Sequence, residues 1–155
     1  MKSVRVARQA FRGIESYPVD ARWRLEGRFE PYDPPKRMVV PDALDRGQQE
    51  VIPGAVAFDV GGATYRIDVF DEEGTEDLFL VFGDLTNRNE TFGGGRYLYT
   101  PPPGADGRVV VDFNRAYNPP CVFTPFATCS LPPPQNRLPI RIEAGEKRYA
   151  GGKER

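Results

Sequence analysis

The sequence contains no histidine and only two cysteines, Cys121 and Cys129, among its 155 residues. Without histidine, neither a Ser-His-Asp triad nor a Cys-His pair can be assembled. The common zinc sites take four ligands from cysteine and histidine, and this chain has too few of them. A hard cation held by carboxylates stays compatible with the composition, but no residue spacing points to one. We therefore expect no metal site, and no cofactor is indicated.

Long apolar runs and an excess of one charge are also missing. No segment approaches the roughly 18 apolar residues that a membrane span needs, and residues 1–10 lack the apolar core of a secretory signal. Basic residues number 21 against 22 acidic ones, and the net charge of −1 offers no general attraction to nucleic acid. We therefore expect a cytoplasmic protein that binds neither membranes nor nucleic acids.

Proline and glycine, by contrast, are abundant. Each occurs 16 times, which is well above average usage, and the prolines cluster at 34–35, 101–103, 119–120 and 132–134. Such punctuation favours short elements and an all-β fold. The length fits a single domain, residues 1–155, with frayed ends at about 1–10 and 150–155.

Alternating hydrophobicity predicts about eight short, mostly antiparallel strands. Residues 21–30 alternate apolar and charged side chains until prolines end the pattern at 32–35, and 55–60 and 64–70 flank a Gly61-Gly62 turn as a hairpin. Residues 4–14 fit either a short helix or another strand. Further strands are expected at 37–40, 78–82, 96–99, 108–113 and 138–143. Sequential hairpins at this spacing predict a small β-barrel or barrel-like sandwich.

One segment, residues 114–137, has six prolines and no periodicity, and it is longer than most structureless loops in compact domains. We call it the strap. It also carries side chains that prefer burial, namely Tyr117, Val122, Phe123, Phe126 and Leu131. A rigid, proline-rich segment packed across one end of the barrel is expected. The strap would form a pocket wall or plug the end of the barrel.

Both cysteines lie in the strap, and three interpretations compete for them. They could be buried reduced thiols that act as small hydrophobic side chains. They could form a disulfide that closes a short loop, although a reducing compartment opposes this. One of them could be a nucleophile whose pKa is lowered by Arg115 or Arg137. The sequence leaves these alternatives open.

A second candidate is the glycine-rich loop, residues 84–95, which Arg96 follows. Consecutive glycines at 93–95 leave backbone N–H groups open to an anion. The loop is not a nucleotide-binding P-loop, because no Lys-Ser/Thr pair and no helix follow it. The competing interpretation is a turn that needs glycine for its backbone conformation.

The stretch DFNRAYNPPCVFTPFATCSLPPPQNRLPIRIEAGEK at 112–147 resembles the signature of DUF1684, a bacterial and archaeal family of unknown function. The segments FRGIESYPVDARWRLEGRFEPYDPP, 54–70 and ETFGGGRYLY are similar to that family too, so the resemblance covers nearly all of 11–149. Larger members carry an additional β-rich N-terminal region, and this chain resembles a short member or a C-terminal domain. No catalytic role follows from the matching positions. These are Arg96, Tyr97, Asp112, Asn114, Tyr117, Asn118, Cys121, Thr124, Cys129, Gln135, Asn136, Arg137, Glu143 and Lys147.

These features together favour a small-molecule-binding domain whose ligand lies between the strap and the glycine-rich loop. Two arginines would meet an acidic group of the ligand, aromatic rings would form apolar walls that include Phe123, and amides would orient the ligand. The expected ligand-binding residues are Arg96, Tyr97, Asn114, Tyr117, Asn118, Cys121, Gln135 and Arg137. A hydrolase-like enzyme that uses a cysteine or a carboxylate, and a protein-interaction or assembly module, are the alternatives. A homodimer is compatible with all three.

Overall fold

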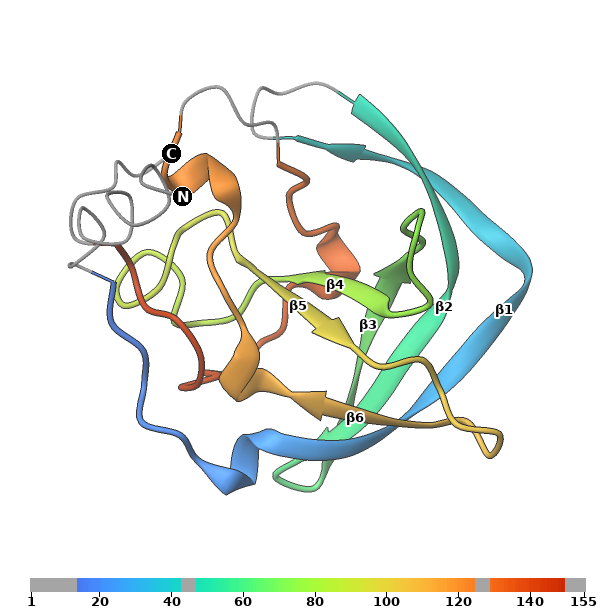
Figure 1. The fold of residues 1–155 in the computed structure, drawn as a ribbon, viewed down its shortest axis with the longest axis horizontal. Helices are drawn as coiled ribbons and strands as arrows, with labels where there is room; N and C mark the ends of the chain where they lie inside the picture. Colours follow the sequence, from blue (N-terminus) through green and yellow to red (C-terminus); the bar gives the residue numbers. More distant parts are fainter. Residues whose placement is uncertain (1–13, 43–46, 125–128, 150–155) are drawn as a thin grey trace.

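A computed structural model describes residues 14–42, 47–124 and 129–149, and the expectations for 1–13 and 150–155 lie outside these ranges. Six strands form one antiparallel sheet in the order β5-β4-β3-β2-β1-β6. The sheet curls into a half-barrel (Figure 1). The all-β prediction is confirmed, and about eight strands is close to the described number. The strands are β1 (Arg24–Pro41), β2 (Gly47–Val60), β3 (Ala63–Phe70), β4 (Leu78–Phe82), β5 (Arg96–Thr100) and β6 (Arg108–Asp112).

The first strand differs from its prediction. Residues 21–23 form a short 3-10 helix, η1 (Ala21–Trp23), and β1 then runs to Pro41 without ending at the prolines of 32–35. The prolines are tolerated because the register against β2 shifts between Pro31 and Lys36, and at such an irregularity a residue needs no ladder hydrogen bond. The separately predicted strand at 37–40 is therefore the second half of β1.

The central hairpin and its neighbours follow the sequence closely. β2 and β3 pair across Gly61 and Gly62, whose φ angles of 60° and 84° are those that favour glycine. β4 has the predicted bounds and pairs with β5. The acidic residues at 71–77 form an exposed turn between β3 and β4. The sequence therefore predicts the hairpin and β4, but it misses the first part of β2, which begins at Gly47 and not at residue 55.

The strand predicted at 138–143 is wrong, because this segment has no strand structure. Pro139 cannot donate a ladder hydrogen bond, and the other backbone groups take individual partners. The N–H of Leu138 donates to the carbonyl of Gly83 over 2.8 Å, and the N–H of Ile142 donates to a carboxylate oxygen of Asp84 over 2.7 Å. Leu138 and Ile142 are nevertheless buried, as their spacing predicted.

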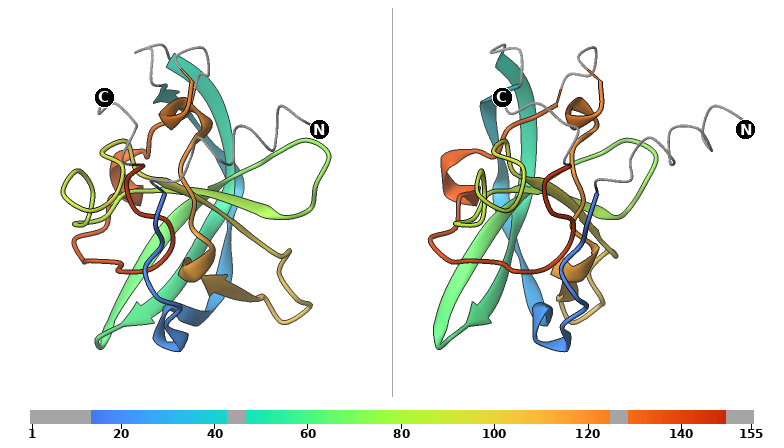
Figure 2. Two further views of the ribbon diagram at one scale, coloured as in Figure 1. Left: turned by 60° about the vertical axis from the view of Figure 1, so that its left-hand side comes forward. Right: turned by 90° about the vertical axis from the view of Figure 1, so that its left-hand side faces the viewer.

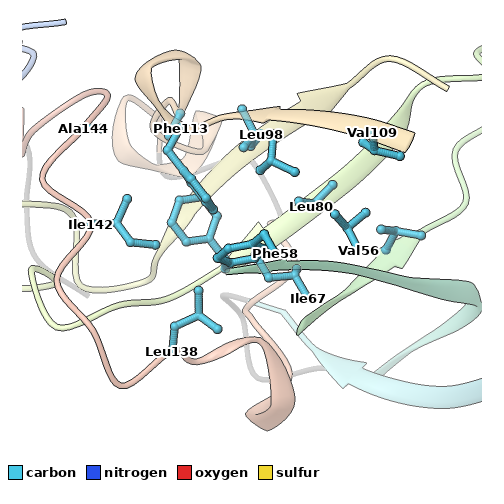
Figure 3. Close-up of a cluster of buried hydrophobic side chains, with 14 residues drawn as sticks. Val56, Phe58, Ile67, Leu80, Leu98, Val109, Phe113, Leu138, Ile142 and Ala144 are labelled. Atoms are coloured by element: carbon cyan, nitrogen blue, oxygen red, sulfur yellow. The ribbon is translucent and has the colours of Figure 1, made fainter. Parts of the chain in front are cut away.

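The two faces of the sheet pack against different partners. One face forms the half-barrel core, in which Val56, Phe58, Ile67, Leu80 and Phe113 converge (Figure 3). Because side chains alternate along a strand, neighbouring residues such as Phe70, Val81 and Tyr97 point away from this core. They form a second cluster together with Val122, Cys121 and Cys129 of the strap. The strap therefore covers the other face of β3, β4 and β5 as a packed layer.

The irregular segments gather on the left of Figure 1, and Figure 2 turns that side towards the viewer. Residues 14–17 run beside 145–147, where Tyr17 N–H donates to Gly145 O over 2.9 Å and Lys147 N–H donates to Glu15 O over 2.7 Å. None of the described helices is long and apolar enough to cross a membrane. The helices in the strap region are η2 (Phe113–Arg115), η3 (Pro120–Val122) and η4 (Pro134–Asn136).

Candidate functional site

Arg96, the expected anion contact, begins β5 and is fully buried. Its guanidinium donates to the backbone carbonyls of Ala144, Ile142 (2.9 Å) and Glu146 (3.4 Å). It also lies 3.5 Å from the Asp84 carboxylate. Burial lowers the pKa of Arg96 from its usual value, and Asp84 opposes this effect. The arginine therefore binds the chain's own C-terminal segment.

Two of the expected asparagines join distant backbone segments. The Asn114 side chain accepts from Asp20 N–H (3.0 Å) and donates to Asp20 O (2.9 Å). The amide of Asn118 donates to the carbonyl of Lys147 over 3.0 Å. Amides that pair with irregular backbone in this way hold segments together. Both residues thus fix the N-terminal and C-terminal segments to the strap.

Gln135 lies at another place, over a buried carboxylate that the sequence did not single out. Its amide donates to Asp68 Oδ1 over 2.6 Å, and the Tyr32 hydroxyl donates to the same oxygen over 2.6 Å. The ammonium of Lys36 lies 2.5 Å from Asp68 Oδ2. In the sequence, Asp68 occupies one of the polar positions of an alternating strand. The pattern therefore does not distinguish it from residues that face solvent. Arg137 follows two residues after Gln135, and its side chain is exposed.

A cavity of about 90 Å³ lies between the strap and the glycine-rich loop. Phe92 and Gly94 line it from the loop, while the strap contributes Pro119, Cys121, Cys129, Ser130 and Leu131. The position is the one expected for the ligand, but the lining is different. No arginine is among the described residues that line it. Of the predicted site residues, Cys121 lines this cavity.

Neither cysteine forms a disulfide, and both are buried, with exposed fractions of 4% for Cys121 and 3% for Cys129. The backbone N–H of Cys121 donates to the sulfur of Cys129 over 3.2 Å. The structure therefore shows the reduced, buried thiols that were one of the three interpretations. Arg115 and Arg137, the cations that could activate a thiol, are both exposed and are not lining residues.

The predicted aromatic walls gather beside the thiols. The hydroxyl of Tyr97 donates to the carbonyl of Ser130 over 3.2 Å. Burial and the neighbouring Cys129 raise the pKa of Tyr97 above its usual value. Tyr117 meets the Tyr97 ring edge-on at 6.0 Å and stacks on Tyr99 at 6.3 Å. Phe123 instead packs against Tyr149, with ring centroids 5.3 Å apart. Tyr97 and Tyr117 thus pack in the same apolar cluster as the thiols, but neither is among the described residues that line the cavity.

The glycine-rich loop approaches its neighbours closely at Gly95. This residue has a φ of 89°, and its N–H donates to Phe92 O over 3.1 Å. A Cβ at Gly95 would lie 2.5 Å from the Phe82 carbonyl oxygen and 2.8 Å from Pro132. Glycine is required there for the turn and for contact with the strap. Gly95 therefore fits the turn interpretation, because its N–H is already used within the loop.

A second hollow, of about 440 Å³, lies at another end of the half-barrel. Its charged lining residues take partners outside the hollow or beside it: Arg22 pairs with Asp20 at 2.8 Å, and Asp59 accepts from the Thr64 hydroxyl at 2.6 Å. Among the described residues, no group of three or more Cys, Asp or Glu side chains could hold a metal ion. The hollow is lined by Arg22, Trp23, Leu25, Asp59, Val60, Gly61 and Glu143.

Comparisons with other proteins give a family and a fold. The sequence matches the family described as protein of unknown function (DUF1684) over residues 9–147. The solution NMR structure of an uncharacterized protein from Haloarcula marismortui is similar, with a TM-score of 0.73 and 28% sequence identity. The match covers 93% of this chain and 80% of that one. Proteins with curated functions give no match.

Proposed function

The chain belongs to DUF1684, a family of unknown function, so its activity has to be inferred from its own residues, and we propose that it binds a small apolar molecule, or the apolar end of a larger one, in the cavity between the strap and the glycine-rich loop. The observation that carries this proposal is the lining. Phe92, Leu131, Pro119 and the two thiols surround about 90 Å³ of space.

The cavity is partly open to solvent, and its lining is mainly apolar. Interiors are close-packed, with few voids larger than a water molecule, and an apolar cavity stays dry because it offers water too few partners. An engineered apolar cavity of about 150 Å³ binds benzene or xenon. The cavity of this protein is smaller, and it suits xenon, a short alkyl group or the edge of a ring.

The walls come from segments that resist collapse. Pro119 and Pro132 stiffen the strap, since proline fixes φ, and Gly95 holds the loop against Pro132. An acidic ligand has less support than an apolar one, because the guanidinium of Arg96 already donates to backbone carbonyls. Ser130 contributes a polar group to the cavity. The ligand is therefore expected to be apolar with at most one polar contact.

The test uses xenon and benzene as probes and a filled cavity as the variant. Titration followed by amide NMR should give saturable shifts at Gly94, Cys121 and Cys129 of the wild-type protein. Leu131→Phe places a larger ring in the lining, and it should weaken binding at least about tenfold, as expected when the site is occupied. Leu85→Phe adds the same bulk at a side chain that is 56% exposed, and it should leave binding unchanged.

The proposal fails if the wild-type protein shows no saturable shifts, or if Leu131→Phe binds the probes as well as Leu85→Phe does. If the probes do bind as expected, the natural ligand is sought by native mass spectrometry of protein purified gently from a cell extract. A bound mass that the wild-type protein carries and the Leu131→Phe variant lacks would identify it.

A further inference from the structure

Both cysteines of the chain line one cavity. Cys121 lies in η3 (Pro120–Val122), which begins at a proline, and Cys129 lies next to it. The backbone N–H that Cys129 Sγ accepts belongs to Cys121 itself, with a separation of 3.2 Å. The Cys129 sulfur is thus held against the very residue that carries the other sulfur, and both thiols line the cavity.

This pair of donors fits one class of metal ion. The chain has no histidine, and no cluster of three or more Cys, Asp or Glu ligands exists among the described residues. A structural zinc ion needs four ligands and a hard cation needs oxygen atoms. Soft thiolates select Cu(I), which is stable with two thiolate ligands. We propose that Cys121 and Cys129 together bind one Cu(I) ion as a two-coordinate dithiolate.

The surroundings can accommodate the charge of this complex. Binding replaces the two thiol protons, which pass to solvent, and leaves one net negative charge on the two sulfurs and the metal. The N–H of Cys121 already points at the Cys129 sulfur. The Tyr97 hydroxyl, which donates to the carbonyl of Ser130 over 3.2 Å, lies beside Cys129. Phe92 and Leu131 place apolar side chains beside the two cysteines. Tyr97 is thus a positioning residue for the metal-bound sulfur.

This inference stands on the sulfur pair and goes beyond the binding of an apolar molecule. The two ideas can fail separately. Cys121→Ser and Cys129→Ser remove a soft ligand but keep the size of the side chain and of the cavity nearly unchanged. Xenon binding to these variants therefore reports whether the cavity is intact, while Cu(I) binding reports the sulfur pair.

The experiment is an anaerobic competition for Cu(I) between the reduced protein and the chromogenic chelator bicinchoninate. We expect one Cu(I) per wild-type chain. Cys121→Ser and Cys129→Ser should each weaken Cu(I) binding at least 100-fold, and Tyr97→Phe should weaken it about 10- to 100-fold, as for other outer-shell partners. Leu85→Phe, at an exposed side chain that is not among the described lining residues, should bind as the wild type does.

Two results would overturn the proposal. One is a wild-type protein that takes no Cu(I) from the chelator. The other is a cysteine variant that still binds xenon and also keeps wild-type Cu(I) affinity. Should the variants not fold, X-ray absorption of the loaded wild-type protein decides the question. Two sulfur neighbours around copper support the site, and a shell of nitrogen or oxygen rejects it.

Discussion

Two irregular segments of this protein pack against the same half-barrel in opposite ways. The C-terminal segment, residues 138–147, is held by the buried charges of Arg96 and Asp84, which bond directly to its backbone. The strap is held at Cys121 and Val122 by apolar contacts with the sheet, and it leaves a cavity. In the residues that the structure describes, neither segment forms a strand. Buried charge fixes the first as scaffold, whereas apolar packing leaves the second with room for a ligand.

The largest expected effect comes from removing the charge under the C-terminal segment. Arg96→Met should lower the free energy of unfolding by about 3–5 kcal/mol, because Asp84 is left as a buried charge without its partner and three carbonyls lose a donor. Urea denaturation measures the effect. Arg108→Met is the matched control. This arginine pairs with Glu26 at side chains about two-thirds exposed, and its loss should change stability by less than about 1 kcal/mol.

Equal effects of the two arginine substitutions would mean that the C-terminal segment is held by its apolar side chains alone. The comparison between the two segments would then lose its basis, since both would depend on hydrophobic contacts. A large loss of stability in Arg96→Met, with xenon and benzene still bound as by the wild type, would sharpen the comparison. It would show that the C-terminal segment stabilises the fold without shaping the cavity beside the strap.

A smaller effect is expected at alkaline pH, and it concerns the strap. Burial raises the pKa of Tyr97, while the pKa in the unfolded chain is about 10. Below that pH both states are protonated and stability is unaffected. Above it the unfolded chain releases the proton and the folded chain keeps it, so the free energy of unfolding falls as pH rises. The expected slope is about 1.4 kcal/mol per pH unit for each such tyrosine.

Tyr97→Phe should therefore make the free energy of unfolding fall less steeply above about pH 10, because one ionisable group no longer contributes to the slope. Tyr17, beside the C-terminal segment, has a pKa that is raised by burial and by Glu90, and Tyr17→Phe should have a similar effect. Urea denaturation at a series of pH values measures both. Tyrosinate absorbance that appears fully near pH 10 in the folded protein would contradict this expectation.

The smallest difference is expected between two buried valines. Val109 belongs to the half-barrel core, and Val122 belongs to the strap cluster. Val109→Ala should cost about 2–3 kcal/mol, and Val122→Ala about 1 kcal/mol, since the cost depends on how tightly the surroundings pack and how well they collapse. Thermal or urea unfolding compares them. If both cost the same, the strap is packed as tightly as the core.

Sequence patterns predicted the part of the fold that depends on local alternation. The hairpin around Gly61-Gly62 and the buried run of β4 are examples, because each carries its own turn or period. The pattern at 138–143 was equally regular but produced no strand. Leu138 and Ile142 are buried, yet the backbone partners are Gly83, Leu85 and the side chains of Asp84 and Arg96, which all lie far away in sequence. Alternation predicts burial but not the identity of the partner.

The candidate site was predicted at the level of segments. The strap and the glycine-rich loop do enclose the cavity, because rigid proline-rich backbone and glycine turns leave space that regular packing would fill. Individual residues were harder to assign. Nothing in the sequence indicates that carbonyls at 142, 144 and 146 converge on Arg96, or that Gln135 and Lys36 meet at Asp68. Such long-range polar contacts have no local signature.

The pairing of residues 14–17 with 145–147 has a further consequence. The chain enters and leaves the half-barrel at neighbouring points, joined by the bridge between Ser16 and Glu146. Neighbouring ends are the arrangement that tolerates domain insertion and circular permutation. The half-barrel is therefore suited to be carried as a guest within the loop of another polypeptide. It could also be reopened at the exposed turn of 71–77, with residues 14 and 149 connected by a short linker, without separating any pair of adjacent strands.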